Sequence, residues 1–161
     1  MSEIDPMDQG QGAQPWSIDR VGVVGMGLIG GSIALDLSQQ GVVVQGLVHR
    51  EVTAERARSR GLAPLVSTDP SCLQDCDLVI LALPLESLLS PQESLIKALP
   101  ERAVVTDVGS VKAEVLAVWR DLHPRFVGSH PMAGTAQAGV DAGLPGLFCG
   151  RPWVSTPESS T

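Results

Sequence analysis

The feature that most constrains the fold is a glycine pattern near the start of the chain. Residues 25–30 read Gly-Met-Gly-Leu-Ile-Gly, which is the spacing G-x-G-x-x-G. The apolar run 20–24 before it is typical of a short buried strand, and residues 28–40 after it carry apolar side chains at helical spacing. A strand, a tight glycine turn and a helix in this order predict the first half of a βαβ unit that binds the pyrophosphate of a dinucleotide.

Each glycine of this loop has a physical role if a dinucleotide binds. Gly25 permits the tight turn, Gly27 lets the backbone approach the pyrophosphate, and Gly30 lets the helix pack closely on the strand. The free backbone amides near Leu28 and Ile29, at the start of the helix, present the positive end of the helix dipole to the phosphates. We therefore interpret these five residues as cofactor-binding. The alternative is a glycine-rich turn that serves packing alone.

The rest of the chain alternates between strand patterns and helix patterns. Further strands are expected at 42–48, 65–66, 77–83, 103–107, 125–128 and 153–156. Helices are expected at 51–60, 70–73, 85–99 (divided by Pro91) and 110–122, and a loop at 129–150. This alternation predicts an α/β fold with a doubly wound, mostly parallel sheet of the Rossmann type. The predicted divisions are a tail at 1–18, one domain at 19–157 and a short polar end at 158–161.

Composition excludes several classes of protein. Hydrophobic residues make up 43% of the chain, which is too many for a disordered protein. The net charge of −7 disfavours nucleic acid as a partner, and no apolar run is long enough to span a membrane. The acidic N-terminus lacks the apolar core of a secretory signal, and the three cysteines match neither a disulfide framework nor a zinc site. We therefore expect a cytoplasmic protein with reduced thiols and no bound metal.

The end of the second predicted strand bears on the choice of nicotinamide cofactor. Enzymes that use NAD place Asp or Glu there to bind the ribose 2′-hydroxyl, whereas enzymes that use NADP tend to have Arg nearby. Here the sequence reads Val48-His49-Arg50, followed by the acid Glu51. We interpret Arg50 as a clamp on the 2′-phosphate, assisted by His49, and expect NADP to be preferred over NAD by about 10- to 100-fold. The alternative for Arg50 is a solvated loop charge.

A second polar cluster follows two strands in the second half of the predicted sheet. One segment (107–112) reads DVGSVK and the other (128–134) reads GSHPMAG. Ligands of such sheets bind at the carboxyl ends of the strands, so His130 and Ser110 are expected on the nicotinamide side. His130 is a candidate general base, with an ordinary loop histidine as the alternative. From the residues alone, Ser110 is better explained as a helix N-cap. Lys112 is close by but could equally be a surface charge at the start of the helix, so it is not assigned to the site.

These segments together resemble a known family. VGVVGMGLIGGS, DVGSVK, GSHPMAG and LFCGRPWVSTP are similar to the prephenate and arogenate dehydrogenases of tyrosine biosynthesis, and the resemblance covers about residues 20–157. GSHPMAG is its most specific part, and the Arg50 pattern is closer to the NADP-using arogenate branch. The resemblance implies an oxidative decarboxylation. A hydride passes from C4 of a cyclohexadienol to the nicotinamide, the 4-hydroxyl loses its proton, and the ring carboxylate leaves as CO2.

The resemblance also implies roles for single residues and a wider architecture. The histidine that matches His130 takes the proton of the 4-hydroxyl, and the serine that matches Ser110 contacts the same hydroxyl. Family members continue with a helical domain that forms the dimer and holds the substrate carboxylates, whereas this sequence stops at Thr161. We therefore expect a cofactor-binding domain with weak or no turnover alone, and a homodimer only with the helical domain. The alternatives are another NADP-dependent reductase, of the hydroxyacid or imine type, and a non-catalytic NADP-binding module.

Overall fold

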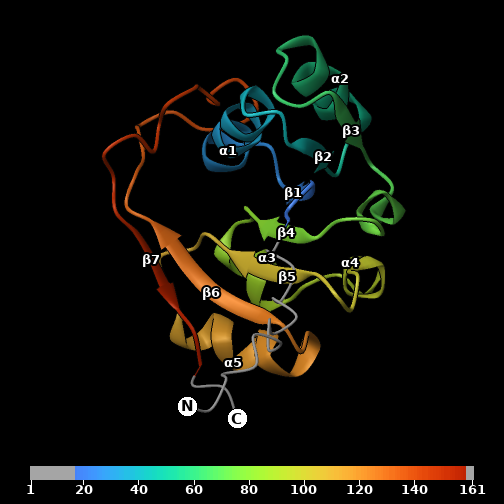
Figure 1. Cartoon of the computed structure of the whole chain (residues 1–161), viewed down its shortest axis with the longest axis vertical. Coiled ribbons are helices and arrows are strands. Elements are labelled where there is room, and N and C mark those ends of the chain that lie inside the picture. The colour runs from blue at the N-terminus through green and yellow to red at the C-terminus, as the bar shows by residue number, and fades with distance from the viewer. Residues whose placement is uncertain (1–16, 159–161) are drawn as a thin grey trace, which may run out of the picture.

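A twisted sheet of seven strands runs through the protein (Figure 1). The structure is a computed structural model that describes residues 17–158, so the predicted tail up to residue 16 and the end after residue 158 lie outside the described residues. The strand order is β3-β2-β1-β4-β5-β6-β7, and each strand is parallel to its neighbour except β7, which is antiparallel to β6. The strands are β1 (Arg20–Val24), β2 (Val43–Leu47), β3 (Leu65–Ser67), β4 (Leu78–Leu81), β5 (Val104–Asp107), β6 (Phe126–Pro131) and β7 (Trp153–Thr156).

Helices cover both faces of this sheet and bury one hydrophobic core on each side. They are α1 (Leu28–Gln39), α2 (Glu51–Ser59), the 3-10 helix η1 (Pro70–Leu73), α3 (Leu85–Leu89), α4 (Glu93–Ala98) and α5 (Ala113–Leu122). On one face, α1 packs on β1 and β2 and α2 packs on β3, with Ala54 and Ala57 fully buried. On the other face, α3, α4 and α5 pack on β4 and β5 around the fully buried Trp119. The doubly wound, Rossmann-like fold predicted from the sequence is thereby confirmed.

Local sequence signals explain most element boundaries. Gly41 and Gly61, at φ +82° and +67°, stand just beyond the ends of α1 and α2, where the left-handed conformation suits glycine. Asp69 caps η1: its carboxylate accepts the backbone amide of Ser71 at 3.0 Å, and this hydrogen bond lowers the pKa of Asp69. The helix expected at 85–99 is divided into α3 and α4 around Pro91, as predicted. No helix among residues 17–158 combines the length and hydropathy that a membrane crossing needs.

Two boundaries near the second polar cluster differ from the sequence prediction. Helix α5 begins at Ala113, not at residue 110, and its N-cap is Lys112, so the interpretation of Ser110 as the cap is wrong. Strand β6 continues to Pro131, so His130 lies on a strand and not in the loop expected at 129–150. The antiparallel partner β7 causes this extension, because it pairs with all four residues from Gly128 to Pro131.

Candidate functional site

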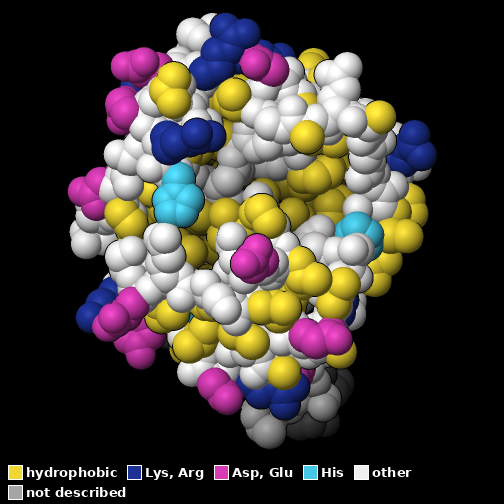
Figure 2. Space-filling model, turned by 180° about the vertical axis from the view of Figure 1, so that it is seen from behind, with side chains coloured by type: hydrophobic (Ala, Val, Ile, Leu, Met, Phe, Trp, Pro, Cys, Tyr) yellow, Lys and Arg dark blue, Asp and Glu magenta, His cyan; other side chains and the backbone are white. Residues whose placement is uncertain are grey.

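A cavity of about 1010 Å³ lies where the order of the strands reverses, between β1 and β4. Its wall includes the whole glycine loop, His49 and Arg50 after β2, and Val108 and Gly109 after β5. Figure 2 shows a hollow in the molecule with a largely hydrophobic floor, and with histidine and basic side chains at its rim. In doubly wound sheets this crevice at the carboxyl ends of the strands is the usual place for a ligand.

The three glycines of the loop differ in what surrounds them. Gly25 has φ +90°, and a Cβ there would lie 2.3 Å from the carbonyl oxygen of Ala82. A Cβ on Gly30 would lie 1.9 Å from the carbonyl oxygen of Gly25, so only glycine lets α1 start this close to β1. Gly27 lines the cavity and has no atom within 4 Å of such a Cβ. Two of the glycines therefore shape the turn, and the third leaves room in front of it.

The start of α1 is suited to bind an anion. The backbone amides of its first turn, including those of Leu28 and Ile29, have no partner within the helix. No acidic residue lies in that turn, and Gly27 at the N-cap supplies no side chain to satisfy the amides. Leu28 and Ile29 both line the cavity, so the positive end of the helix dipole faces it.

The basic residues after β2 form another part of the cavity wall. Arg50 is exposed at the N-cap of α2, and its guanidinium makes no hydrogen bond or ion pair with any residue from 17 to 158. Its acidic neighbour Glu51 is held by Arg58, at 2.6 Å between carboxylate oxygen and guanidinium nitrogen. His49 Nε2 lies 3.4 Å from Nε2 of Gln92, which comes from the far side of the cavity. The guanidinium of Arg50 is thus left available to a ligand.

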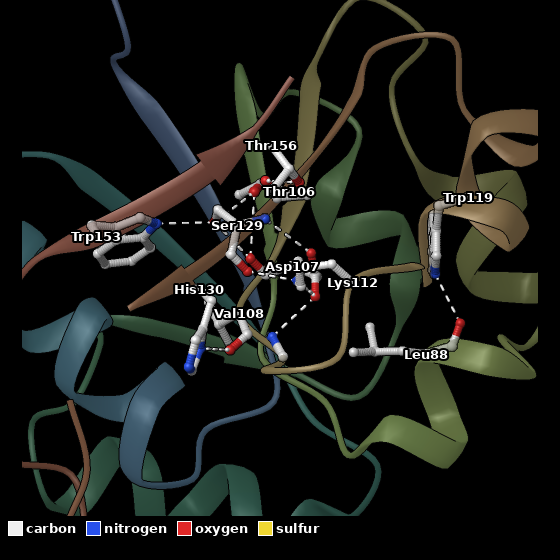
Figure 3. A network of polar contacts seen from close by, with 12 residues as sticks. Leu88, Thr106, Asp107, Val108, Lys112, Trp119, Ser129, His130, Trp153 and Thr156 are labelled. Atoms are coloured by element: carbon white, nitrogen blue, oxygen red, sulfur yellow. Dashed lines mark hydrogen bonds and ion pairs between the residues drawn. The ribbon is translucent and has the colours of Figure 1, made fainter. Parts of the chain in front are cut away.

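His130 lies beside this cavity, on β6. Its Nδ1 is 3.2 Å from the carbonyl oxygen of Val108, which follows β5 (Figure 3). A carbonyl only accepts hydrogen bonds, so this contact places the hydrogen on Nδ1 and leaves Nε2 as an acceptor. Val108 lines the cavity, whereas His130 and the exposed Ser110 are not part of its lining. The structure therefore places His130 in contact with a lining residue, Val108, and Ser110 directly after another, Gly109.

A buried ion pair supports the strand ends next to His130. The carboxylate of Asp107 is fully buried and pairs with the ammonium group of Lys112, whose side chain is only 18% exposed (Figure 3). Lys112 Nζ also donates to the carbonyl oxygen of Ser129 at 2.7 Å. Asp107 in turn accepts the backbone amides of Ser129 and Gly109, at 3.1 and 3.0 Å. Of the alternatives left open for Lys112, the surface charge is therefore excluded.

The hydroxyl of Ser129 joins three strands at the same place. It donates to the carbonyl oxygen of Asp107 at 2.7 Å and accepts from Thr106 Oγ1 at 2.9 Å, both on β5. It also accepts from the indole nitrogen of Trp153 on β7, at 3.0 Å. Sequence reasoning missed this network, although one signal was available: an acidic residue that ends an apolar strand needs a partner when it is buried.

The described residues offer no cluster for a metal ion. Among residues 17–158, no three His, Cys, Asp or Glu side chains lie close enough together to hold one. Cys72, Cys76 and Cys149 are all free thiols. The cavity is instead lined by the backbone of the glycine loop, by hydroxyl and amide side chains, and by the charged or titratable side chains of His49, Arg50 and Asp141. The helix start and the arginine suit a phosphate-bearing organic ligand.

A doubly wound sheet whose glycine loop opens a helix at the reversal of strand order defines a nucleotide-binding domain of the Rossmann type. Known proteins narrow this class further. The sequence profile of the family described as prephenate dehydrogenase, nucleotide-binding domain, matches residues 33–161. The chain belongs to this family of oxidoreductases, as its motifs predicted.

Individual relatives agree with this assignment. The chain is 33% identical to a cyclohexadienyl dehydrogenase of Zymomonas mobilis, over 88% of this chain and 50% of the relative. It is 32% identical to a prephenate dehydrogenase of Lactococcus lactis, over 85% of this chain and 40% of the relative. The chain thus spans half or less of the length of these curated relatives.

Solved structures show the same fold. A crystal structure of Synechocystis arogenate dehydrogenase superposes with a TM-score of 0.82 at 40% identity, over 86% of this chain and 50% of that one. Prephenate dehydrogenase from A. aeolicus, in complex with hydroxyphenyl propionate and NAD+, gives a TM-score of 0.81 at 31% identity, over 92% of this chain and 54% of that one.

Proposed function

We propose that this chain is the cofactor-binding domain of an NADP-dependent dehydrogenase that oxidises and decarboxylates arogenate or prephenate. Its family, and the NAD+ held by the similar A. aeolicus protein, support a nicotinamide dinucleotide as the cofactor. The observation that carries the choice of NADP is the free guanidinium of Arg50 at the cavity, with Glu51 turned to Arg58. The 40% identity to an arogenate dehydrogenase favours arogenate as the substrate.

The residues of the glycine loop fit the pyrophosphate of such a cofactor. Gly25 and Gly30 shape the turn, Gly27 keeps the approach open, and the amides of Leu28 and Ile29 bind phosphate oxygens at the start of α1. His49 and Arg50 hold the 2′-phosphate of the adenosine ribose. His49 contributes through its ring, which is kept near the cavity by Gln92.

His130 serves as the general base of the reaction. The nicotinamide, when bound, accepts the hydride that leaves C4 of the substrate ring. His130 accepts the proton of the 4-hydroxyl at Nε2, because the Val108 carbonyl oxygen fixes the hydrogen on Nδ1. Ser110, exposed beside the cavity residue Gly109, contacts the same hydroxyl. The electrons of the breaking carbon–carboxylate bond enter the ring as CO2 leaves.

Several properties of the whole enzyme belong to the same proposal. The substrate carboxylates are held by a helical domain that also forms a homodimer, so turnover by residues 1–161 alone is weak or absent. The protein works in the cytoplasm, where its three free thiols stay reduced.

The cofactor part is tested by calorimetric titration of the chain with NADP+ and with NAD+. We expect NADP+ to bind about 10- to 100-fold more tightly, and Arg50→Ala to remove most of this preference while NAD+ binding stays unchanged. Arg120→Ala on α5 is the matched control, because it also removes one exposed arginine. Equal losses of NADP+ and NAD+ affinity in Arg50→Ala would refute the clamp.

The catalytic part is tested in the form of the protein that turns over arogenate or prephenate. His130→Asn should lower turnover by about 100- to 10,000-fold, measured as reduced dinucleotide, because the proton acceptor is lost. Its affinity for NADP+ should not change, since His130 does not line the cavity. Turnover equal to that of the wild type would exclude His130 as the base.

A further inference from the structure

Residues 132–152 connect β6 to β7 by a long route. This connection, here called the crossing segment, contains neither helix nor strand and passes alongside α1 in Figure 1. Five of its residues, 137–141, line the same cavity as the glycine loop. A segment without regular structure that forms part of a ligand cavity needs contacts to other elements to hold its shape.

Helix α1 supplies the first set of such contacts. The backbone amide of Leu144 donates to Ser32 Oγ at 3.0 Å, and the amide of Gly146 donates to Asp36 Oδ1 at 2.8 Å. Gly143 lies directly on the backbone of Gly31, because a Cβ on Gly143 would be 3.2 Å from Gly31 Cα. The far part of the crossing segment is therefore fixed against the helix that opens at the glycine loop.

Helix α2 and the residue after it supply the second set, through two arginines. The guanidinium of Arg60 donates to the carbonyl oxygen of Val140 at 2.9 Å and to that of Gly143 at 3.1 Å. Arg56 Nε donates to the carboxylate of Asp141 at 2.7 Å, but both side chains are more than half exposed. The Arg60 side chain is 28% exposed and bonds two backbone carbonyls at once. Arg60 is therefore the stronger of the two ties.

The two arginines also offset the negative charge of Asp141. Asp141 is a carboxylate in the wall of a cavity suited to phosphate. Arg56 faces it at 2.7 Å and Arg60 Nε at 3.9 Å, so its negative charge is offset by two positive ones. Neither arginine lines the cavity itself.

We propose that residues 137–141 form a second wall of the dinucleotide site, and that Arg60, assisted by Arg56, holds this wall in its binding position before the cofactor arrives. The inference rests on the proposed function, since it takes the ligand of the cavity to be a dinucleotide. Arg60 acts as a positioning residue. Because the segment is already ordered, binding does not have to offset the entropy of ordering it.

The test compares two arginine variants in calorimetric titrations of the chain with NADP+ and NAD+. Arg60→Met should lower the affinity for both cofactors by about 10-fold, because residues 137–141, without their contact to Arg60, must become ordered on binding. Arg120→Met is the control. Arg120 lies on α5, does not line the cavity, and pairs with Glu158, not with the crossing segment. Because Arg60→Met also removes a positive charge, the uncharged variant Gly143→Ala separates the lost contact from the lost charge.

A structural readout and an uncharged variant complete the test. Amide hydrogen exchange of residues 137–141 in the free chain should be faster in Arg60→Met than in Arg120→Met. Gly143→Ala, which changes no charge, should also weaken both cofactors, because its Cβ pushes the segment off Gly31. Equal affinities in Arg60→Met and Arg120→Met, or wild-type affinity in a folded Gly143→Ala, would contradict the proposed role of residues 137–141. Failure of the wild-type chain to bind any dinucleotide would instead overturn the proposed function.

Discussion

Replacing Lys112 by methionine tests the importance of the buried ion pair. The substitution keeps an unbranched side chain but leaves the carboxylate of Asp107, which is fully buried, without its positive partner. Removing one member of a buried pair destabilises a protein by about 3–5 kcal/mol, because an uncompensated charge remains in the interior. Whole domains unfold with only about 5–15 kcal/mol, so this is a large share of the total. For a chain of this length it corresponds to a decrease in Tm of roughly 6–20 °C.

Urea unfolding followed by tryptophan fluorescence measures this loss, since Trp119 is fully buried in the native state. With an m value near 2 kcal/mol/M, the unfolding midpoint should fall by about 1.5–2.5 M. Lys97→Met is the matched control. Its ammonium pairs with Glu93 on the surface of α4, with both side chains more than 70% exposed. That variant should lose less than about 0.5 kcal/mol.

The two partners of the pair should not be equivalent. Asp107→Asn leaves Lys112, which retains 18% exposure and can reach water, so it should cost less than Lys112→Met. The double variant, Asp107→Asn with Lys112→Met, should be more stable than Lys112→Met alone, because the unpaired charge is gone. A loss in Lys112→Met no larger than in Lys97→Met would refute the reasoning. So would a double variant less stable than either single one.

Two further predictions concern the glycine loop and the thiols. Gly30→Ala should lose dinucleotide binding and thermal stability together, because its Cβ would lie 1.9 Å from the Gly25 carbonyl oxygen. Gly27→Ala, which meets no neighbour, should keep the Tm of the wild type in a thermal scan and lose affinity alone. Burial raises the pKa of Cys72 and of Cys76 to about 11, so iodoacetamide at pH 8 should modify the exposed Cys149 first. Mass spectrometry would contradict this if Cys72 or Cys76 reacted as fast in the folded chain.

Local patterns of the sequence were sufficient for the parts of the structure that are determined locally. The turn at the glycine loop depends on φ and on close packing within one βαβ unit, and its glycines stand where they are needed for it. The division of the helix at Pro91 and the cap at Asp69 are equally local. These elements carry the fold class and the cofactor side of the candidate site.

The remaining features depend on contacts between residues far apart in the sequence. The ammonium group of Lys112 meets the carbonyl of Ser129 only because β5 and β6 end side by side. The strand character of His130 comes from β7, more than twenty residues further along the chain. Arg60 bonds the crossing segment, whose sequence shows neither helix nor strand periodicity and so gives no sign that its backbone is ordered. Single-sequence patterns contain none of this pairing information.

The pairing of β6 gives the stretch that carries the proposed base a lower local stability than the strands that bind the cofactor. Its parallel strand pairing with β5 covers only Phe126 and Val127, whereas the stretch that carries His130 has strand pairing with β7 alone. The other bonds of that stretch to β5 and the residues after it involve side chains, those of Asp107, Ser129 and His130 among them. Separation of β7 from this edge would therefore leave the proposed base held by these side-chain bonds alone, while the central strands and the glycine loop stay folded. Such a subglobal opening lies below the free energy of global unfolding. This pairing predicts a population of molecules that bind the cofactor but have a less ordered base. The free energy of the pairing between β6 and β7 sets the size of that population.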